Sequence, residues 1–91
     1  PMSISYPKNR IRVLLLENIH EDAQRIFLQE GYQVETLTGA LDEDELMERI
    51  KDVSILGIRS KTKVTKRVLE KANRLIAVGT FSIGTDQIDL V

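Results

Sequence analysis

The chain has 91 residues, enough for one small domain, and its 42% hydrophobic and 30% charged residues are typical of a globular protein rather than a disordered one. Thirteen basic and fourteen acidic residues leave a net charge of -1, which gives no reason to bind nucleic acid or an anionic membrane. The absence of cysteine excludes disulfides and suits the reducing cytoplasm, and with a single histidine, His20, we expect no metal site.

The chain opens with a polar segment and then an apolar one. Residues 1–10 carry two prolines and show no periodicity, so we interpret them as a tail. The run IRVLLL at 11–16 is continuously apolar, as in a strand covered on both faces. The segment 17–32 then changes to helical spacing. Its expected buried stripe comprises Ile19, Ala23, Ile26 and Phe27.

The later segments repeat the alternation of strand and helix. QVETL at 33–37 alternates apolar and polar residues, which predicts an edge strand with one face in water. The short apolar runs at 53–58 and 75–79 predict two further buried strands. The segments 39–52 and 65–72 have helical spacing, with Leu46, Met47, Ile50 and Val68 facing inward.

Capping signals mark the helix ends. Asn18 with Glu21 has the spacing of a capping box for the first helix, and Gly31 lies where a C-terminal glycine cap belongs. Asp42 with Glu45 has the spacing of a capping box for the second helix. Thr65 is the expected cap of the third helix.

The element order β-α-β-α-β-α-β, with short connections, predicts parallel strands joined by right-handed crossovers. We therefore expect an α/β fold: a flavodoxin-like, doubly wound parallel sheet with strand order 2-1-3-4. Open parallel sheets bind ligands beyond the carboxyl ends of their strands. The loops that follow the four strands are accordingly the places to look for chemistry.

The most suggestive of these loops is Arg59-Ser60-Lys61. A guanidinium, a hydroxyl and an ammonium group leave a buried strand together, and a helix follows whose N-terminus would add positive partial charge. Such a cluster suits a carboxylate or a phosphate. Residue chemistry alone leaves a solvated basic loop as the alternative, because Arg and Lys are common on surfaces.

The segment GTFSIGTD at 79–86 has two glycines, Gly79 and Gly84, but neither nucleotide-binding glycine pattern, and Asp86 would repel a phosphate beside it. Two interpretations remain: a tight turn or close backbone approach, and a backbone loop that faces a ligand. We expect His20 to be structural, and the acidic run at 42–45 to serve the helix start rather than a metal.

Three segments together closely resemble the N-terminal part of a known family, the D-isomer-specific 2-hydroxyacid dehydrogenases. They are GIRSKTKVTKRVLEKANRLIAVGTFSIGTDQIDL (57–90), RVLLLENIHEDA (12–23) and GALDEDELMERIKD (39–52). The form Ile-Gly-Thr-x-Gln-x-Asp-Leu within the first resembles the members that act on phosphoglycerate. The resemblance implies NAD-dependent oxidation of 3-phosphoglycerate to 3-phosphohydroxypyruvate, the first step of L-serine biosynthesis, by a homo-oligomeric enzyme.

The resemblance also implies roles for particular residues. The family's substrate-binding loop falls on Arg59, Ser60 and Lys61. Its second cleft loop falls on 80–86, where backbone near Ile83 and Gly84 approaches the substrate and the nicotinamide.

The family's catalytic Arg, Glu and His and its glycine-rich NAD loop would all follow Val91. We therefore assign no catalytic residue here. We expect 11–91 to be the N-terminal part of a substrate-binding domain, without the hinge or the Rossmann domain, and inactive alone. The alternative is a free-standing small-anion binding or regulatory module of flavodoxin-like fold.

Overall fold

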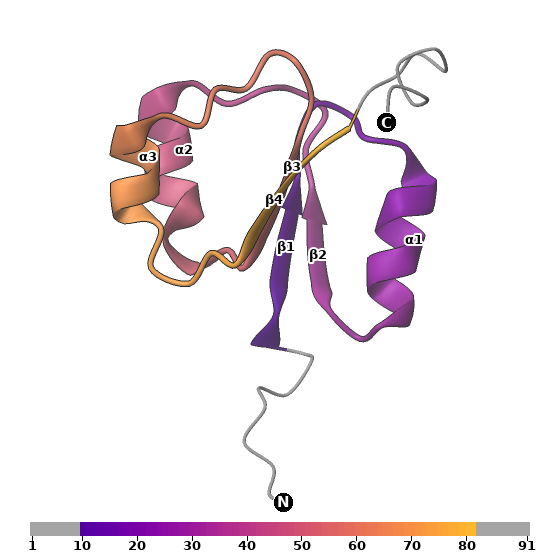
Figure 1. Cartoon of the computed structure of the whole chain (residues 1–91). Helices are drawn as coiled ribbons and strands as arrows, with labels where there is room; N and C mark the ends of the chain where they lie inside the picture. Colours follow the sequence, from indigo (N-terminus) through magenta and orange to yellow (C-terminus); the bar gives the residue numbers. More distant parts are fainter. Residues whose placement is uncertain (1–9, 82–91) are drawn as a thin grey trace, which may run out of the picture.

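The computed structural model describes residues 10–81 of the chain and shows a four-stranded, all-parallel sheet (Figure 1). The spatial order is β2-β1-β3-β4, as the sequence predicts. Of the predicted tail, only Arg10 lies among the described residues. The strands are β1 (Arg12–Leu15), β2 (Gln33–Thr36), β3 (Ile55–Ile58) and β4 (Ala77–Thr80).

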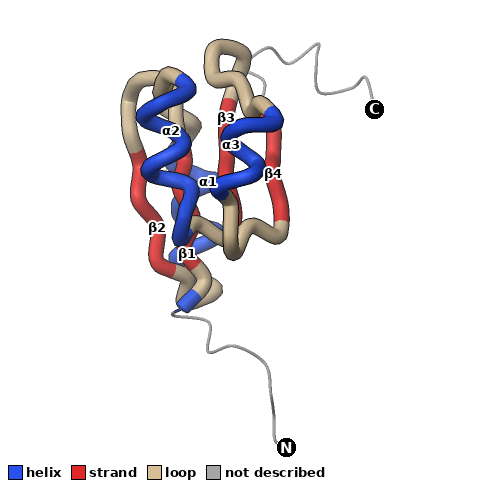
Figure 2. Tube along the Cα trace, turned by 90° about the vertical axis from the view of Figure 1, so that its left-hand side faces the viewer, coloured by secondary structure: helices blue, strands red, loops and turns tan. Residues whose placement is uncertain are grey.

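Helices cover the sheet on both faces, which confirms the doubly wound α/β fold. Helix α1 (Glu21–Gln29) lies on one face, and α2 (Glu43–Arg49) and α3 (Lys66–Lys71) lie side by side on the other (Figures 1 and 2). A short 3-10 helix, η2 (Ile50–Asp52), continues α2 toward β3. All strands point the same way, so the loops after them gather at one edge of the sheet.

The apolar run 13–16, which comprises most of β1 and the residue after it, is the centre of the core because its side chains are buried on both faces, as the sequence predicts. Leu14 and Leu16 belong to the cluster on the α2–α3 side. Val13 and Leu15 belong to a smaller cluster on the α1 side. All four side chains are at most 2% exposed.

Three of the four predicted caps are confirmed. The Asp42 carboxylate accepts from the Glu45 N–H at 2.8 Å and the Glu45 side chain closes the box, while the Thr65 hydroxyl accepts from Val68 N. Gly31 follows α1 with a φ of 88°. The prediction for Asn18 is wrong. Asn18 has a φ of 55°, so it lies in a left-handed turn that precedes the helix.

The N-cap of α1 is instead His20, whose Nδ1 accepts from Asp22 N at 3.0 Å. Histidine is not among the usual N-cap residues, so sequence preference alone favours Asn18 over His20. The result confirms a structural role for this side chain, which is exposed at the start of the helix.

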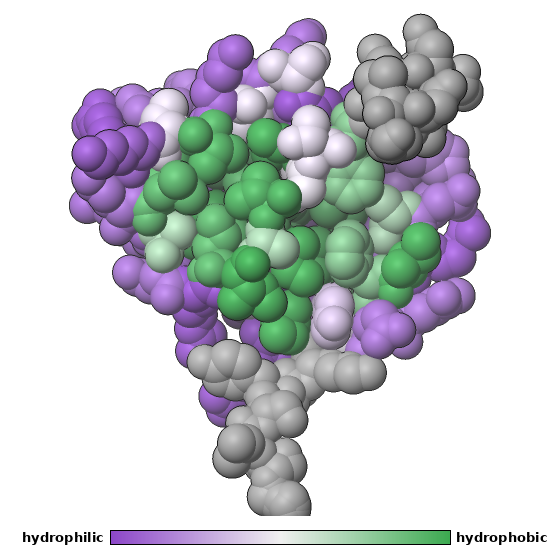
Figure 3. Space-filling model, viewed as in Figure 1, coloured by the Kyte–Doolittle hydropathy of each residue, from purple (hydrophilic) through white to green (hydrophobic). Residues whose placement is uncertain are grey.

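Two burial predictions are wrong. The segment 75–79 was expected to be a buried strand, yet Ile76 is 70% and Val78 42% exposed. The reason is that β4 is the edge strand of the described sheet, and α1 packs mainly against β2. Ile26 of the predicted α1 stripe is likewise 60% exposed. Figure 3, which faces the β4 edge, shows the apolar surface that results.

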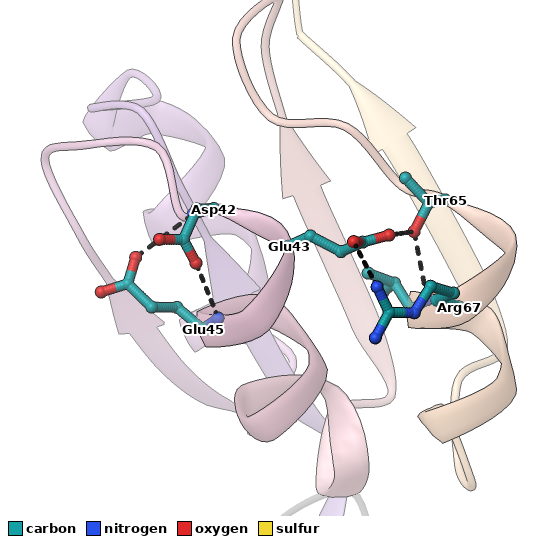
Figure 4. Close-up of polar contacts among 6 residues, drawn as sticks. Asp42, Glu43, Glu45, Thr65 and Arg67 are labelled. Atoms are coloured by element: carbon teal, nitrogen blue, oxygen red, sulfur yellow. Dashed lines mark hydrogen bonds and ion pairs between the residues drawn. The ribbon is translucent and has the colours of Figure 1, made fainter.

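Helices α2 and α3 are joined by polar contacts at their N-terminal ends. Glu43 of α2 accepts a hydrogen bond from the Thr65 hydroxyl at 2.6 Å and pairs with Arg67 of α3 at 3.1 Å (Figure 4). The acidic run at 42–45 therefore caps one helix and contacts the next, as expected of a helix start.

Within residues 10–81, no three His, Cys, Asp or Glu side chains come together in a way that could hold a metal ion. In the same part of the chain, every helix is too short or too polar to cross a membrane.

Candidate anion-binding loop at the carboxyl edge of the sheet

The loops after the strands are bonded to one another at the carboxyl edge. Glu17, just after β1, donates its N–H to Gly39 O at 3.1 Å, and so ties the loop after β2 to this turn. At the end of β4, Phe81 N donates to Ile58 O at 2.8 Å. The start of the second predicted cleft loop thus lies directly beside Ile58, the residue that precedes Arg59.

The loop after β3 is wrapped around one carboxylate, that of Glu17. Oε2 accepts from the N–H groups of Arg59 and Thr62, and Oε1 accepts from the N–H of Lys61, each at 2.9 Å. The Glu17 side chain crosses to a segment 42 to 45 residues further along the chain. It is only 8% exposed, so these contacts are largely shielded from water.

The electrostatics of this contact favour an ionised carboxylate. Burial alone raises the pKa of Glu17, but contacts from the Thr62 side chain and the N–H groups of Lys61, Arg59 and Thr62 outweigh it and lower the pKa to about 2. Within the described residues the buried Thr62 hydroxyl has no partner in hydrogen-bonding geometry. We therefore attribute the lowering chiefly to the three N–H donors.

The three predicted substrate-binding residues lie together on this loop. Arg59 is partly buried, and its Nη1 donates to the Glu17 carbonyl oxygen at 3.3 Å. Ser60 and Lys61 are exposed. Within the described part of the chain, neither Arg59 nor Lys61 has a carboxylate side chain within ion-pair distance, so both keep positive charge available at the edge.

The helix that follows the loop starts where the sequence predicts: α3 begins at Lys66, and Thr65 caps its first turn. The partial charge expected from its N-terminus stays a prediction. The N–H groups near the loop come from the loop itself, and Glu17 occupies three of them. Any further anion must therefore be held mainly by the side chains of Arg59, Ser60 and Lys61.

The second predicted loop is described only at its beginning. Ile83 and Gly84, which the family resemblance places near the cofactor, lie outside the described residues. Gly79 lies inside β4 opposite Gly57, so the interpretation of Gly79 as a tight turn is wrong. The ring of Phe81 lies over both glycines, which makes Gly79 a site of close side-chain approach.

A pocket beside the edge is lined mainly by uncharged groups. It has a volume of about 370 Å³ and lies between the start of α1 and the end of β2. Its lining includes Asn18, His20, Gln24, Thr36 and Thr38, with Glu21, and no lysine or arginine of the described residues. The positive charge of the edge therefore lies on the loop after β3 and not here.

Glu17 is the residue of this site that sequence reasoning missed. Its only sequence signal is an acidic side chain directly after a continuous apolar run, where the chain leaves a buried strand. Its partners are distant in sequence, so no local spacing pattern reveals them. The positive φ of 65° at Glu17 is equally invisible in the sequence.

The fold and the loop define an α/β domain with a positively charged carboxyl edge. Comparison with known proteins places it more closely: residues 13–91 match the family model described as "D-isomer specific 2-hydroxyacid dehydrogenase, catalytic domain". The chain therefore belongs to the D-isomer-specific 2-hydroxyacid dehydrogenase family.

Among curated proteins, the chain is similar to D-3-phosphoglycerate dehydrogenases. It is 55% identical to that of Dictyostelium discoideum over 87 residues, which cover 96% of this chain and 21% of the relative. It is 51% identical to D-3-phosphoglycerate dehydrogenase 2 of Saccharomyces cerevisiae, over 88% of this chain and 17% of the relative. Identity to the Escherichia coli K12 enzyme is 41%, over 96% of this chain and 22% of the relative. The chain thus spans about a fifth of the length of these relatives.

Proposed function

We propose that this chain is the N-terminal part of an NAD-dependent oxidoreductase that converts 3-phospho-D-glycerate to 3-phosphohydroxypyruvate, the first step of L-serine biosynthesis. The family membership and the printed names of the relatives support the reaction class and the substrate. The observation that carries the proposal to this chain is the loop of Arg59, Ser60 and Lys61, whose positive side chains stand without carboxylate partners among the described residues.

The chemistry of the substrate suits this loop. Phosphoglycerate carries a carboxylate and a phosphate, both of which bind guanidinium and ammonium groups through charge-assisted hydrogen bonds. Arg59 offers a planar fork of N–H donors, and Lys61 offers a compact charge on a flexible stem. Ser60 adds a hydroxyl that can donate to a phosphate oxygen.

The described residues do not fit the principal site of a dinucleotide. A pyrophosphate needs free N–H groups and positive potential at a helix N-terminus that follows a strand. After β1 the corresponding helix begins with Glu21 and Asp22 and is capped by His20. We therefore propose that NAD is held mainly by parts of the enzyme outside residues 10–81, with Ile83 and Gly84 of this chain near the nicotinamide.

We also propose that the 91-residue chain is catalytically inert by itself. Hydride transfer requires two reactants to be held in a close, aligned geometry. This loop can hold one reactant, and no described residue is assigned to acid–base work. We place the enzyme in the cytoplasm as a homo-oligomer, and its partner as a small-molecule substrate rather than a nucleic acid or a membrane.

Calorimetric titration of the 91-residue chain with 3-phosphoglycerate tests the proposal. We expect weak binding that Arg59→Ala and Lys61→Ala each reduce by about tenfold, because each removes a charge-assisted contact. Lys63→Ala is the matched control, since Lys63 is an exposed lysine of the same loop. Equal binding by wild type and both variants would contradict the loop assignment.

Two further titrations separate the alternatives. Tight binding of NADH to the isolated chain would contradict the proposed division of the site. In the second titration, inorganic phosphate that binds as tightly as 3-phosphoglycerate would favour the free-standing anion-binding or regulatory module.

A further inference from the structure

Glu17 is a buried, ionised side chain to which the proposed function gives no task. We propose that Glu17 is the positioning residue of the anion-binding loop: its carboxylate fixes the backbone of residues 59–62, so that Arg59 and Lys61 are held at the carboxyl edge in the arrangement that binds the substrate. This inference rests on the proposed function.

The hydrogen bonds fix the loop at nearly every residue. Of the four successive residues 59–62, all but Ser60 donate their N–H group to the Glu17 carboxylate, each at 2.9 Å. Three donors converging on one group from different positions leave the loop backbone little freedom. Because Arg59 and Lys61 are themselves two of the donors, the points from which both cationic side chains project are fixed by this single carboxylate.

The main chain of Glu17 adds a fourth contact. Its carbonyl oxygen accepts from Arg59 Nη1 at 3.3 Å, so Glu17 orients the guanidinium as well as the backbone behind it. The left-handed conformation of Glu17, with a φ of 65°, is uncommon for a residue with a side chain. Backbone strain of this kind persists only where surrounding contacts hold it, and here the loop supplies those contacts.

The contact requires a carboxylate rather than any polar group of similar size. An ionised carboxylate only accepts hydrogen bonds and can satisfy several donors at once. A glutamine side chain has the same length, but an NH₂ group replaces one of the two carboxylate oxygens. That NH₂ group would face a backbone N–H of the loop. Glu17→Gln therefore removes at least one of the three loop contacts without emptying the site.

The experiment uses the full 91-residue chain and has two separate readouts. Amide hydrogen exchange, followed by NMR, reports the order of the loop, and titration with 3-phosphoglycerate reports binding. The variants are Glu17→Gln, Glu17→Asp and, as a matched control, Glu35→Gln, because Glu35 is an exposed glutamate of β2 that pairs only with Arg49 among the described residues.

In Glu17→Gln we expect exchange at Arg59, Lys61 and Thr62 to quicken by about tenfold, while Leu14 and Leu56 in the core keep their protection. The dissociation constant for 3-phosphoglycerate should rise by about tenfold. Glu17→Asp retains the carboxylate on a shorter side chain, so the changes in exchange rate and in dissociation constant should both be smaller than in Glu17→Gln. Glu35→Gln should change neither.

The outcomes separate the two ideas. Unchanged exchange at the three loop amides would overturn the positioning role whatever the binding result. Tighter binding in Glu17→Gln would also overturn it, because Glu17 would then be an anion that competes with the substrate. If the wild-type chain does not bind 3-phosphoglycerate, the proposed function fails, and the exchange data still decide whether Glu17 orders the loop.

If Glu17→Gln does not fold, the wild-type chain gives the same answer by acid titration. The amide chemical shifts of Arg59, Lys61 and Thr62 should then move together, with one common midpoint, as Glu17 takes up its proton. Independent midpoints at the three amides would contradict the proposal.

Discussion

The ring of Phe81 lies against Gly57, at the place where β3 and β4 run side by side toward the carboxyl edge. A Cβ added at Gly57 would lie 2.6 Å from Leu15 Cδ2 and 3.0 Å from Phe81 Cε1. At Gly79, the β4 partner of Gly57, the same ring atom would be 3.3 Å away. The two glycines thus form a flat patch that allows Phe81, which follows β4, to fold back over the sheet beside the anion-binding loop.

Gly57→Ala should destabilise the domain by about 1–3 kcal/mol, because the added methyl group overpacks a filled part of the core. Leu15 is buried and cannot move away freely. Chemical denaturation monitored by circular dichroism measures the loss. Gly39→Ala is the control, since a Cβ at Gly39 would have no atom within 4 Å. Equal stabilities for Gly57→Ala and wild type would show that Leu15 and Phe81 do not pack closely against Gly57.

The stability of the domain should fall in acid through Glu17. Because the pKa of Glu17 is lowered from 4.5 to about 2 on folding, its contribution is present in full above about pH 4.5 and is lost as the pH falls toward 2. The size of the shift corresponds to about 3 kcal/mol. The measurable quantity is the difference in unfolding free energy between wild type and Glu17→Gln, taken from pH 6 down to pH 2.

Other carboxylates also titrate in this range, and the difference between the two proteins removes their common contribution. It should be largest near pH 6 and shrink toward pH 2, where wild-type Glu17 becomes uncharged like the glutamine. A difference that is independent of pH would show that the charge of Glu17 does not stabilise the loop.

The sequence predicts most of this fold because its strongest signals are local or periodic. The side chains of the β1 run alternate between two apolar clusters. The capping box at Asp42 and the cap at Thr65 each depend on a spacing of three residues. Such features depend on residues that are close in the sequence, so they can be predicted without knowledge of the tertiary structure.

The features that the sequence does not reveal depend on distant parts of the molecule. Val78 is an apolar, β-branched residue typical of a buried strand. It is exposed because β4 lies at the edge of the described sheet. Asn18 loses its capping role because the turn before α1 is left-handed. Glu17 finds its partners more than 40 residues away, through the parallel pairing of β1 and β3. The sequence therefore points to the cationic side chains of the candidate loop but not to the carboxylate behind them.

Substitution of a buried leucine should lower the free energy of unfolding much more than substitution of an exposed one. Leu46 of α2 is fully buried, and Leu46→Ala should cost about 2–5 kcal/mol through lost burial and the cavity that remains. Leu69 of α3 is 49% exposed, and Leu69→Ala should cost well under half as much. Urea denaturation compares the two. Similar losses for both would mean that Leu69 is covered in solution, for example by self-association of the apolar surface.

Thr65 should matter to two helices at once. Its hydroxyl accepts from Val68 N at 3.2 Å and donates to Glu43 Oε2 at 2.6 Å, so it caps α3 and joins it to α2. Thr65→Val removes both contacts with little change of shape and should destabilise the domain by about 1–2 kcal/mol, the cost of a lost cap. A further loss should come from Glu43 Oε2, which loses its donor while Oε1 keeps its contact with Arg67. Thr65→Ser keeps the hydroxyl and should lie within about 0.5 kcal/mol of wild type. A double-mutant cycle with Glu43→Gln, followed by thermal unfolding, isolates the contact between the helices. Additive effects would show that Thr65 acts only as a cap, whereas a coupling between the two substitutions would show that this pair fastens α3 to α2 behind the anion-binding loop.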